Sequence, residues 1–122
     1  MIVLDTHVWV WWVHGDPRLT ANEADAIGVS AISCWEVGKL VEYGPLDLGT
    51  SVRDWLSLAL GYPGVRLVEL PPEIAAASTS LPRLIHRDLA DQIIIASSLV
   101  NGCPLLTSDQ KLIEYLHVET IA

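Results

Sequence analysis

Five carboxylates stand near the points where a predicted strand ends or a predicted helix begins. They are Asp5, Glu36, Asp88, Asp91 and Asp109. Carboxylates that are held close together repel one another and tend to stay protonated unless a cation lies between them. Clusters of hard oxygen ligands suit Mg²⁺ or Mn²⁺. If the fold brings these side chains together, the residue types indicate a site for a divalent metal ion.

Strands and helices are predicted to alternate along the chain, from short apolar runs and from apolar residues at helical spacing. The predicted strands are 2–4, 28–32, 65–70, 104–107 and 118–122. The predicted helices are 7–13, a short helix after Thr20, 33–42, 50–60, 72–80, 88–102 and 108–116. This order predicts an α/β fold, a three-layer α/β/α sandwich around a central parallel sheet of about five strands. The 122 residues are expected to form one domain, 1–122.

A parallel sheet explains how distant carboxylates would meet. All of its strands end at one edge, and a helix that leads into a strand begins at that same edge. Ligands of open α/β folds bind at this carboxyl edge. We therefore expect the five acids to gather there, with residues 2–4 as the central strand that places Asp5.

Each acid also has a local structural interpretation. Ser33 and Glu36 match the spacing of a capping box. Asp88 is suited to cap its helix with Asp91 in the first turn, and Thr107 or Ser108 could cap the last helix with Asp109 beside it. Capping does not require an acid, because Ser, Thr or Asn would serve as well. The recurrence of acids therefore favours a metal site.

The composition limits the classes of function. With 15 acidic and 7 basic residues the chain carries a formal charge of −8, which argues against a broad phosphate-binding surface. A hydrophobic content of 51% is typical of a globular protein. No apolar run approaches the roughly 20 residues of a membrane span, and the first residues lack a basic region, so we expect a soluble, cytoplasmic protein without membrane contact. Cys34 and Cys103 are too few for a disulfide framework.

An acidic metal site without a nucleophilic serine or cysteine favours phosphodiester hydrolysis. A divalent cation lowers the pKa of water and neutralises charge on the reacting phosphate, so no side-chain base is needed. The sequence has no P-loop, no GxSxG turn and no HExxH zinc motif. His7, the one histidine next to a site acid, is a minor candidate.

Three blocks of the sequence carry a family resemblance: LDTHVWVWWVHGDPRLT, SAISCWEVGKL and HRDLADQIIIASSLVNGCPLLTSDQKL. Together they resemble the PIN-domain ribonucleases, specifically the VapC-like toxins of toxin–antitoxin pairs, over nearly the whole chain. The resemblance implies a Mg²⁺- or Mn²⁺-dependent endoribonuclease that acts on RNA, forms a homodimer and binds a small VapB-like antitoxin. It implies that the catalytic acids and metal ligands are Asp5, Glu36, Asp91 and Asp109, with Asp88 as an accompanying ligand and Thr6 and Thr107 as hydroxyls beside the site.

Departures and basic residues refine this picture. Leu89 stands where many relatives carry proline, and Gln92 stands where they often carry arginine. The loss of an arginine at position 92 would weaken phosphate contacts. Four basic residues lie within five positions of a site acid and could guide RNA phosphates. They are Lys39, Arg83, Arg87 and Lys111. The alternative for Lys39 is a pair with Glu36 or Glu42 along its own helix.

Two other functions compete with the ribonuclease interpretation. A phosphoacceptor receiver domain needs an aspartate that ends the third strand and a lysine that ends the fifth, and neither is present. A catalytically silent PIN-like module would act only through protein binding, although no site acid is missing. Among the tryptophans, Trp9 and Trp12 share a predicted helical face that packs on the sheet. Trp11 points elsewhere and is expected to serve a dimer or antitoxin surface.

Overall fold

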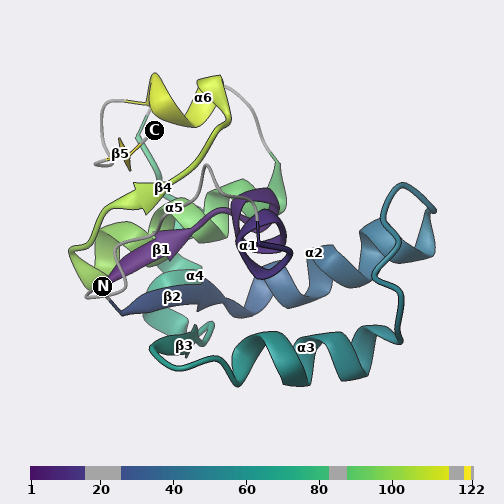
Figure 1. Cartoon of the computed structure of the whole chain (residues 1–122). Helices are drawn as coiled ribbons and strands as arrows, with labels where there is room; N and C mark the ends of the chain where they lie inside the picture. The colour runs from purple at the N-terminus through teal and green to yellow at the C-terminus, as the bar shows by residue number, and fades with distance from the viewer. Residues whose placement is uncertain (16–25, 83–87, 116–119, 122) are drawn as a thin grey trace.

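The structure is a computed structural model that describes residues 1–15, 26–82, 88–115 and 120–121. Within these residues, five parallel strands form one sheet in the order β3-β2-β1-β4-β5, with β1 in the centre (Figure 1). The strands are β1 (Ile2–Leu4), β2 (Ile27–Ser30), β3 (Val65–Val68), β4 (Leu105–Leu106) and β5 (Thr120–Ile121). The predicted α/β architecture and the central place of residues 2–4 are confirmed.

Helices alternate with these strands as the sequence predicts. They are α1 (Thr6–Val13), α2 (Ala31–Glu42), α3 (Val52–Leu60), α4 (Pro72–Ser78), α5 (Leu89–Asn101) and α6 (Gln110–Ile113). The short helix predicted after Thr20 falls outside the described residues. Among the described helices, none is long and apolar enough to cross a membrane.

The central strand is buried on both faces, which explains its uninterrupted apolar sequence. Leu4 packs with residues of α1 and α3, including Trp9 and Trp55, whose rings meet edge to face at 5.0 Å. Val3 faces the other way and packs with Ile94 of α5. Figure 1 shows α4 and α5 behind β1 and β2. The sheet therefore lies between two helical layers.

Helix α1 buries the face that its spacing predicts. Val8 and Trp9 are buried, and Trp12 and Val13 pack against the same cluster. Trp11 lies on the other side of the helix and remains 38% exposed. The tryptophans that align with the apolar face are thus core residues.

Helix α2 begins earlier than predicted, because β2 ends at Ser30. The Ser30 hydroxyl accepts a hydrogen bond from the Ile32 backbone N–H at 3.3 Å and caps the helix. The predicted capping box at Ser33 and Glu36 is therefore wrong, and Ser33 is a fully buried helical residue. Ile32 continues the apolar run beyond the strand because its side chain packs against the two hydrophobic clusters that include residues of α5.

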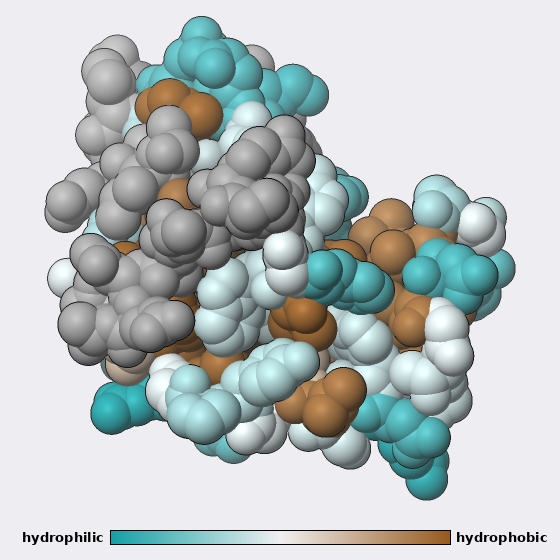
Figure 2. All heavy atoms as spheres, in the orientation of Figure 1, coloured by the Kyte–Doolittle hydropathy of each residue, from teal (hydrophilic) through white to brown (hydrophobic). Residues whose placement is uncertain are grey.

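The surface is mixed in character. On the face drawn in Figure 2, hydrophobic residues form separate small patches between hydrophilic ones. The most exposed aromatic side chains among the described residues are Trp35 (51%) and Tyr43 (75%), both at helix α2. Scattered apolar residues are normal on a protein surface, so these patches by themselves indicate no binding site.

Candidate metal centre at the carboxyl edge of the sheet

Asp5 is held at the end of the central strand from both sides. Its backbone N–H still bonds to the Leu106 carbonyl of β4 at 3.0 Å, so the residue is fixed as a continuation of the sheet. Its side chain caps α1, because Oδ1 accepts a hydrogen bond from the Thr6 backbone N–H at 2.8 Å. Oδ2 accepts a second bond from the Thr107 hydroxyl, also at 2.8 Å. The carboxylate is therefore oriented by two different strand ends.

Thr107 links Asp5 to Asp109. Its hydroxyl donates to Asp5 and accepts a hydrogen bond from the Asp109 backbone N–H at 3.0 Å. The Asp109 carboxylate itself caps α6 by accepting from the Lys111 N–H at 2.9 Å. The prediction that Thr107 or Ser108 caps this helix is wrong, because Asp109 is itself the N-cap residue. The β4 end thus places a hydroxyl and a carboxylate beside the β1 end.

Glu36 reaches the same region from α2. The Thr6 hydroxyl donates a hydrogen bond to the Ser33 hydroxyl at 2.9 Å, and the Thr6 side chain lies close enough to the Glu36 carboxylate to favour its ionised form. Ser33 and Glu36 are three residues apart and so share one face of α2. Sequence reasoning missed Ser33 as a member of this network, because the capping-box prediction placed it outside the helix.

The start of α5 supplies the two remaining acids. Asp88 caps the helix by accepting a hydrogen bond from the Asp91 backbone N–H at 3.0 Å, as predicted. Asp88 is exposed, and Asp91, in the first turn, is half-buried. Helix α5 packs on α2, and the Asp88 charge is close enough to Glu36 to affect its ionisation. Asp88 therefore stands near Glu36, and Asp91 lies in the first turn of the helix that Asp88 caps.

Burial and mutual repulsion oppose the ionisation of two of these acids. Burial raises the pKa of Asp5 above its ordinary value, against the lowering effect of the bonds from Thr107 and Thr6, and repulsion from Asp109 raises it further. Burial likewise raises the pKa of Glu36, as do Asp88 and Asp5, against the bond with Thr6. His7 favours the ionised form of both carboxyls. His7 thus acts electrostatically on the centre.

The donor set suits a hard divalent cation. It consists of carboxylate oxygens with hydroxyls beside them, and a cation would offset the burial and the weaker repulsion that raise the pKa of Asp5 and Glu36. Within the described residues, no group of three or more His, Cys, Asp or Glu side chains is arranged to hold a metal ion as it stands. Mg²⁺ commonly retains several waters and binds through one or two carboxylates. The residues therefore fit such an ion with water as additional ligands.

The predicted basic residues do not all face this centre. Lys39 forms an ion pair with Glu42 at 3.0 Å, which is one of the pairs that the alternative interpretation predicted. The backbone of Lys111 bonds to Asp109 and its side chain is exposed. Arg83 and Arg87 lie outside the described residues.

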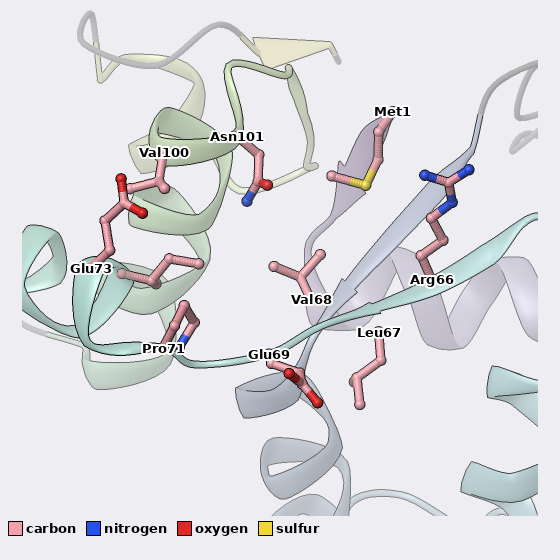
Figure 3. Close-up of a pocket in the computed structure, with 10 residues that line it drawn as sticks. Met1, Arg66, Leu67, Val68, Glu69, Pro71, Glu73, Val100 and Asn101 are labelled. Carbon is pink, nitrogen blue, oxygen red and sulfur yellow. The ribbon is translucent and has the colours of Figure 1, made fainter.

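A separate hollow of about 390 Å³ lies between β3 and the end of α5. Figure 3 shows Met1 and Val68 toward its middle, with Arg66 and Glu73 on opposite sides. None of its lining residues belongs to the carboxylate cluster. The cluster, rather than this hollow, therefore carries the candidate chemistry.

A model of the PIN domain matches residues 2–116, which include all five acids. The chain belongs to the PIN-domain family. A curated relative, Ribonuclease VapC22 of Mycobacterium tuberculosis, is 33% identical over 95% of this chain and 92% of its own length. Membership of the PIN family sets aside the receiver-domain reading.

Solved structures share the PIN fold. VapBC2 from Rickettsia felis, bound to a promoter DNA fragment, matches with a TM-score of 0.75 and 15% identity over 99% of this chain and 98% of that chain. A toxin–antitoxin complex from Klebsiella pneumoniae gives a TM-score of 0.71 and 16% identity over 100% and 97% of the two chains. FitAcB from Neisseria gonorrhoeae gives 0.69 and 20% over 100% and 97%. At these identities the likeness concerns the fold.

Proposed function

We propose that this PIN-domain chain is a metal-dependent endoribonuclease and the toxin of a VapBC-type toxin–antitoxin pair. The observation that carries the proposal is the buried Asp5 carboxylate, joined through Thr107 to Asp109 and close to Glu36. The name of the relative from Mycobacterium tuberculosis, a VapC ribonuclease, supports the reaction. The toxin–antitoxin complexes among the structural neighbours support the pairing.

The acids would hold one or two Mg²⁺ or Mn²⁺ ions. Asp5, Glu36, Asp91 and Asp109 are the proposed ligands, and Asp88 is an accessory ligand. When bound, such an ion lowers the pKa of water and neutralises charge on the reacting phosphate. The chain supplies a preset arrangement, because the hydrogen bonds from Thr6 and Thr107 leave the Asp5 carboxylate little freedom to turn.

The protein groups around the acids also control protons. Asp5 and Glu36 must be ionised to act as ligands, and the Thr107 and Thr6 hydrogen bonds favour that form against the effect of burial. Thr107 accepts from the Asp109 N–H, so its hydroxyl proton is directed at Asp5 Oδ2 rather than elsewhere. Thr6 and Thr107 are therefore positioning residues in this proposal.

The acidic character of the centre suits a cationic partner segment. A VapB-like antitoxin would place a basic side chain against these carboxylates and block RNA and metal together. We further propose that residues 1–122 form one nuclease domain, that the toxin is a cytoplasmic homodimer, and that exposed Trp11 contributes to an interface with the second subunit or the antitoxin.

The test compares RNA cleavage by the wild type with cleavage by Asp5→Asn and Asp91→Asn, in Mg²⁺ or Mn²⁺ and in EDTA. We expect both variants to lose more than about 100-fold in rate, beyond the loss typical for an outer-shell partner of a metal site. Glu73→Gln is the matched control, because it removes an exposed carboxylate that lies outside the cluster. Equal activity of all four proteins would overturn the nuclease proposal and leave the silent binding module.

A further inference from the structure

The Ser33 hydroxyl is a buried polar group of α2 that is bonded to another helix. Ser33 is fully buried, and the cap of α2 is supplied by Ser30, whose hydroxyl accepts from the Ile32 N–H. Ser78 and Ser97, two other buried serines in helices, each donate the hydroxyl to a carbonyl of their own helix at 2.7 Å. The hydrogen bond that Ser33 accepts comes instead from α1.

The partner of Ser33 stands beside a proposed metal ligand. The Thr6 hydroxyl donates to Ser33 at 2.9 Å, and Thr6 is itself fully buried. Thr6 directly follows Asp5, and its backbone N–H donates to the Asp5 carboxylate at 2.8 Å. One residue of α1 therefore connects the Asp5 carboxylate to Ser33 of α2.

Ser33 also stands one helical turn before a second proposed ligand. Ser33 and Glu36 are three positions apart and share one face of α2, and Glu36 interacts there with Thr6 and Asp5. A shift or rotation of the first turns of α2 would move the Glu36 carboxylate away from that of Asp5. The bond between Thr6 and Ser33 opposes such a movement, because it joins the first turns of α1 and α2.

Folding alone does not require a hydroxyl at position 33. Alanine has a higher helix propensity than serine, and a buried hydroxyl costs free energy unless it is bonded. Two buried partners can be replaced by apolar groups of the same shape with little change in stability. A satisfied buried polar pair does, however, fix the arrangement of the elements that it joins. Its effect here is to hold α2 in one place against α1.

We infer that Ser33 is a positioning residue of the metal centre, which acts through Thr6 to fix the Glu36 carboxylate relative to that of Asp5. Ser33 does not itself touch the metal or the RNA. This inference rests on the proposed function, because it takes these carboxylates to be ligands of a divalent cation.

The experiment measures binding of Mn²⁺ alone to the full-length chain, without RNA. Free Mn²⁺ is followed by electron paramagnetic resonance during a titration, at a temperature at which every variant is folded. Ser33→Ala should weaken the Kd for Mn²⁺ by about 10- to 100-fold, the usual effect of losing an outer partner of a metal ligand. Ser97→Ala is the matched control, because it removes a buried helical hydroxyl that bonds only within α5, and it should bind Mn²⁺ like the wild type.

A double-mutant cycle with Thr6→Val separates positioning from packing. Because Ser33 acts through Thr6, the double variant should bind Mn²⁺ no more weakly than Thr6→Val alone. Stability should respond differently. Ser33→Ala leaves the Thr6 hydroxyl buried without its acceptor and should lower the Tm, whereas the double variant removes both polar groups and should regain most of that loss. Recovery of the Tm without recovery of Mn²⁺ affinity is the expected signature of a positioning role.

RNA cleavage provides a second measurement. In Ser33→Ala, the Mn²⁺ concentration for half-maximal cleavage should rise by a factor similar to that for the Kd, and KM for RNA at saturating Mn²⁺ should stay the same.

Unchanged Mn²⁺ affinity in Ser33→Ala would overturn the inference, even if the wild type cleaves RNA as proposed. Affinity that recovers together with the Tm in the double variant would also overturn it, as would effects of the two substitutions that simply add, because Ser33 would then act by packing. A wild type that binds no Mn²⁺ would reject both this inference and the metal-dependent nuclease. The expected pattern of Mn²⁺ affinities in a chain that cuts no RNA would support the role of Ser33 and reject the ribonuclease.

Discussion

Asp5 must serve two opposing requirements at once. It is only 7% exposed, yet it has to be negatively charged to bind a cation. Its two hydrogen bonds, from the Thr6 N–H and the Thr107 hydroxyl, favour the charged form, but burial outweighs them and the pKa is raised. A residue in this state stores unfavourable energy that a bound metal ion would release.

The first prediction concerns the pH dependence of stability in metal-free buffer. Because the pKa of Asp5 is raised above 3.8, the folded state binds more protons than the unfolded state in the window above that value. The free energy of unfolding therefore falls as pH rises through the window. Asp5→Asn, which keeps a cap acceptor for Thr6, should melt at a higher temperature than the wild type at neutral pH. The difference should vanish as pH falls below about 3.8.

Thermal melts of both proteins across this pH range would check the prediction, with Glu73→Gln as the control for loss of an exposed charge. A constant difference at every pH would show that desolvation of Asp5 is not its origin.

The second prediction concerns Thr107 as a positioning residue. Thr107→Val keeps the shape of this buried side chain but removes the bond to Asp5 and the acceptor for the Asp109 N–H. We expect RNA cleavage to fall by about 10- to 100-fold, as for other outer partners of metal ligands, and the metal concentration for half-maximal activity to rise. Thr107→Ser retains the hydroxyl and should stay close to wild type. Equal loss in both variants would assign Thr107 a packing role only.

At the scale of helices and strands, three helix N-termini each carry an acid that is both an N-cap residue and a proposed metal ligand. Asp5, Asp88 and Asp109, three of the proposed metal ligands, each cap a helix with their carboxylate. Helix capping fixes these side chains in orientation, so local folding rules and the site are satisfied by the same bonds. Helix capping therefore accounts for the position of three of the five acids, which are N-cap residues.

The third prediction tests one helix end that is remote from the acids. Gly102 ends α5 with φ +62°, a conformation that costs a residue with a Cβ about 1 kcal/mol or more. Gly102→Ala should therefore lower the free energy of unfolding by about that amount, while cleavage per folded molecule stays the same. Gly38→Ala, inside α2, should instead be stabilising, because the added Cβ would lie 3.9 Å from Val52 Cγ1, an ordinary van der Waals contact. Denaturant titrations measure both, and a neutral Gly102→Ala would contradict the capping role.

The sequence predicts the elements where periodicity and end signals agree. The run from Asp88 to Gly102 carries both an N-cap and a C-terminal glycine, and α5 spans Leu89–Asn101. The start of α2 was misplaced because Ile32 continues an apolar run, although it packs from a helix rather than a strand. Side-chain networks such as Thr6 with Ser33 depend on tertiary contacts between distant segments, which one sequence does not display.

At the scale of the whole molecule, parallel topology creates the candidate centre. Asp5 and Thr107 are 102 positions apart in sequence, yet their side chains are bonded because β1 and β4 are neighbours in the sheet. The alternation of strands and helices was sufficient to predict that these ends meet. The exposure of Trp35 and Tyr43 was not predicted, since sequence spacing alone does not reveal which face of α2 remains uncovered.

The fourth prediction follows from thermodynamic linkage. A cation that binds only the folded chain should raise its stability, by about 2.7 kcal/mol at a free concentration a hundredfold above Kd. We expect Mn²⁺ and Mg²⁺ to raise the Tm of the wild type, and the effect to weaken as pH falls, because protons compete for the acids whose pKa is raised. Asp5→Asn should show a much smaller shift. Equal shifts in the two proteins would place the cation elsewhere.

The ends of the RNA products test the central claim most directly. Wild-type protein cuts RNA in ¹⁸O-labelled water with Mg²⁺, and the products are analysed by mass spectrometry at early times. Hydrolysis by water at the acidic centre predicts one ¹⁸O atom in the terminal phosphate, no 2′,3′-cyclic phosphate, and no cleavage in EDTA or by Asp5→Asn. Cyclic phosphate ends, formed equally well in EDTA and by Asp5→Asn, would contradict a metal-dependent nuclease built on these carboxylates.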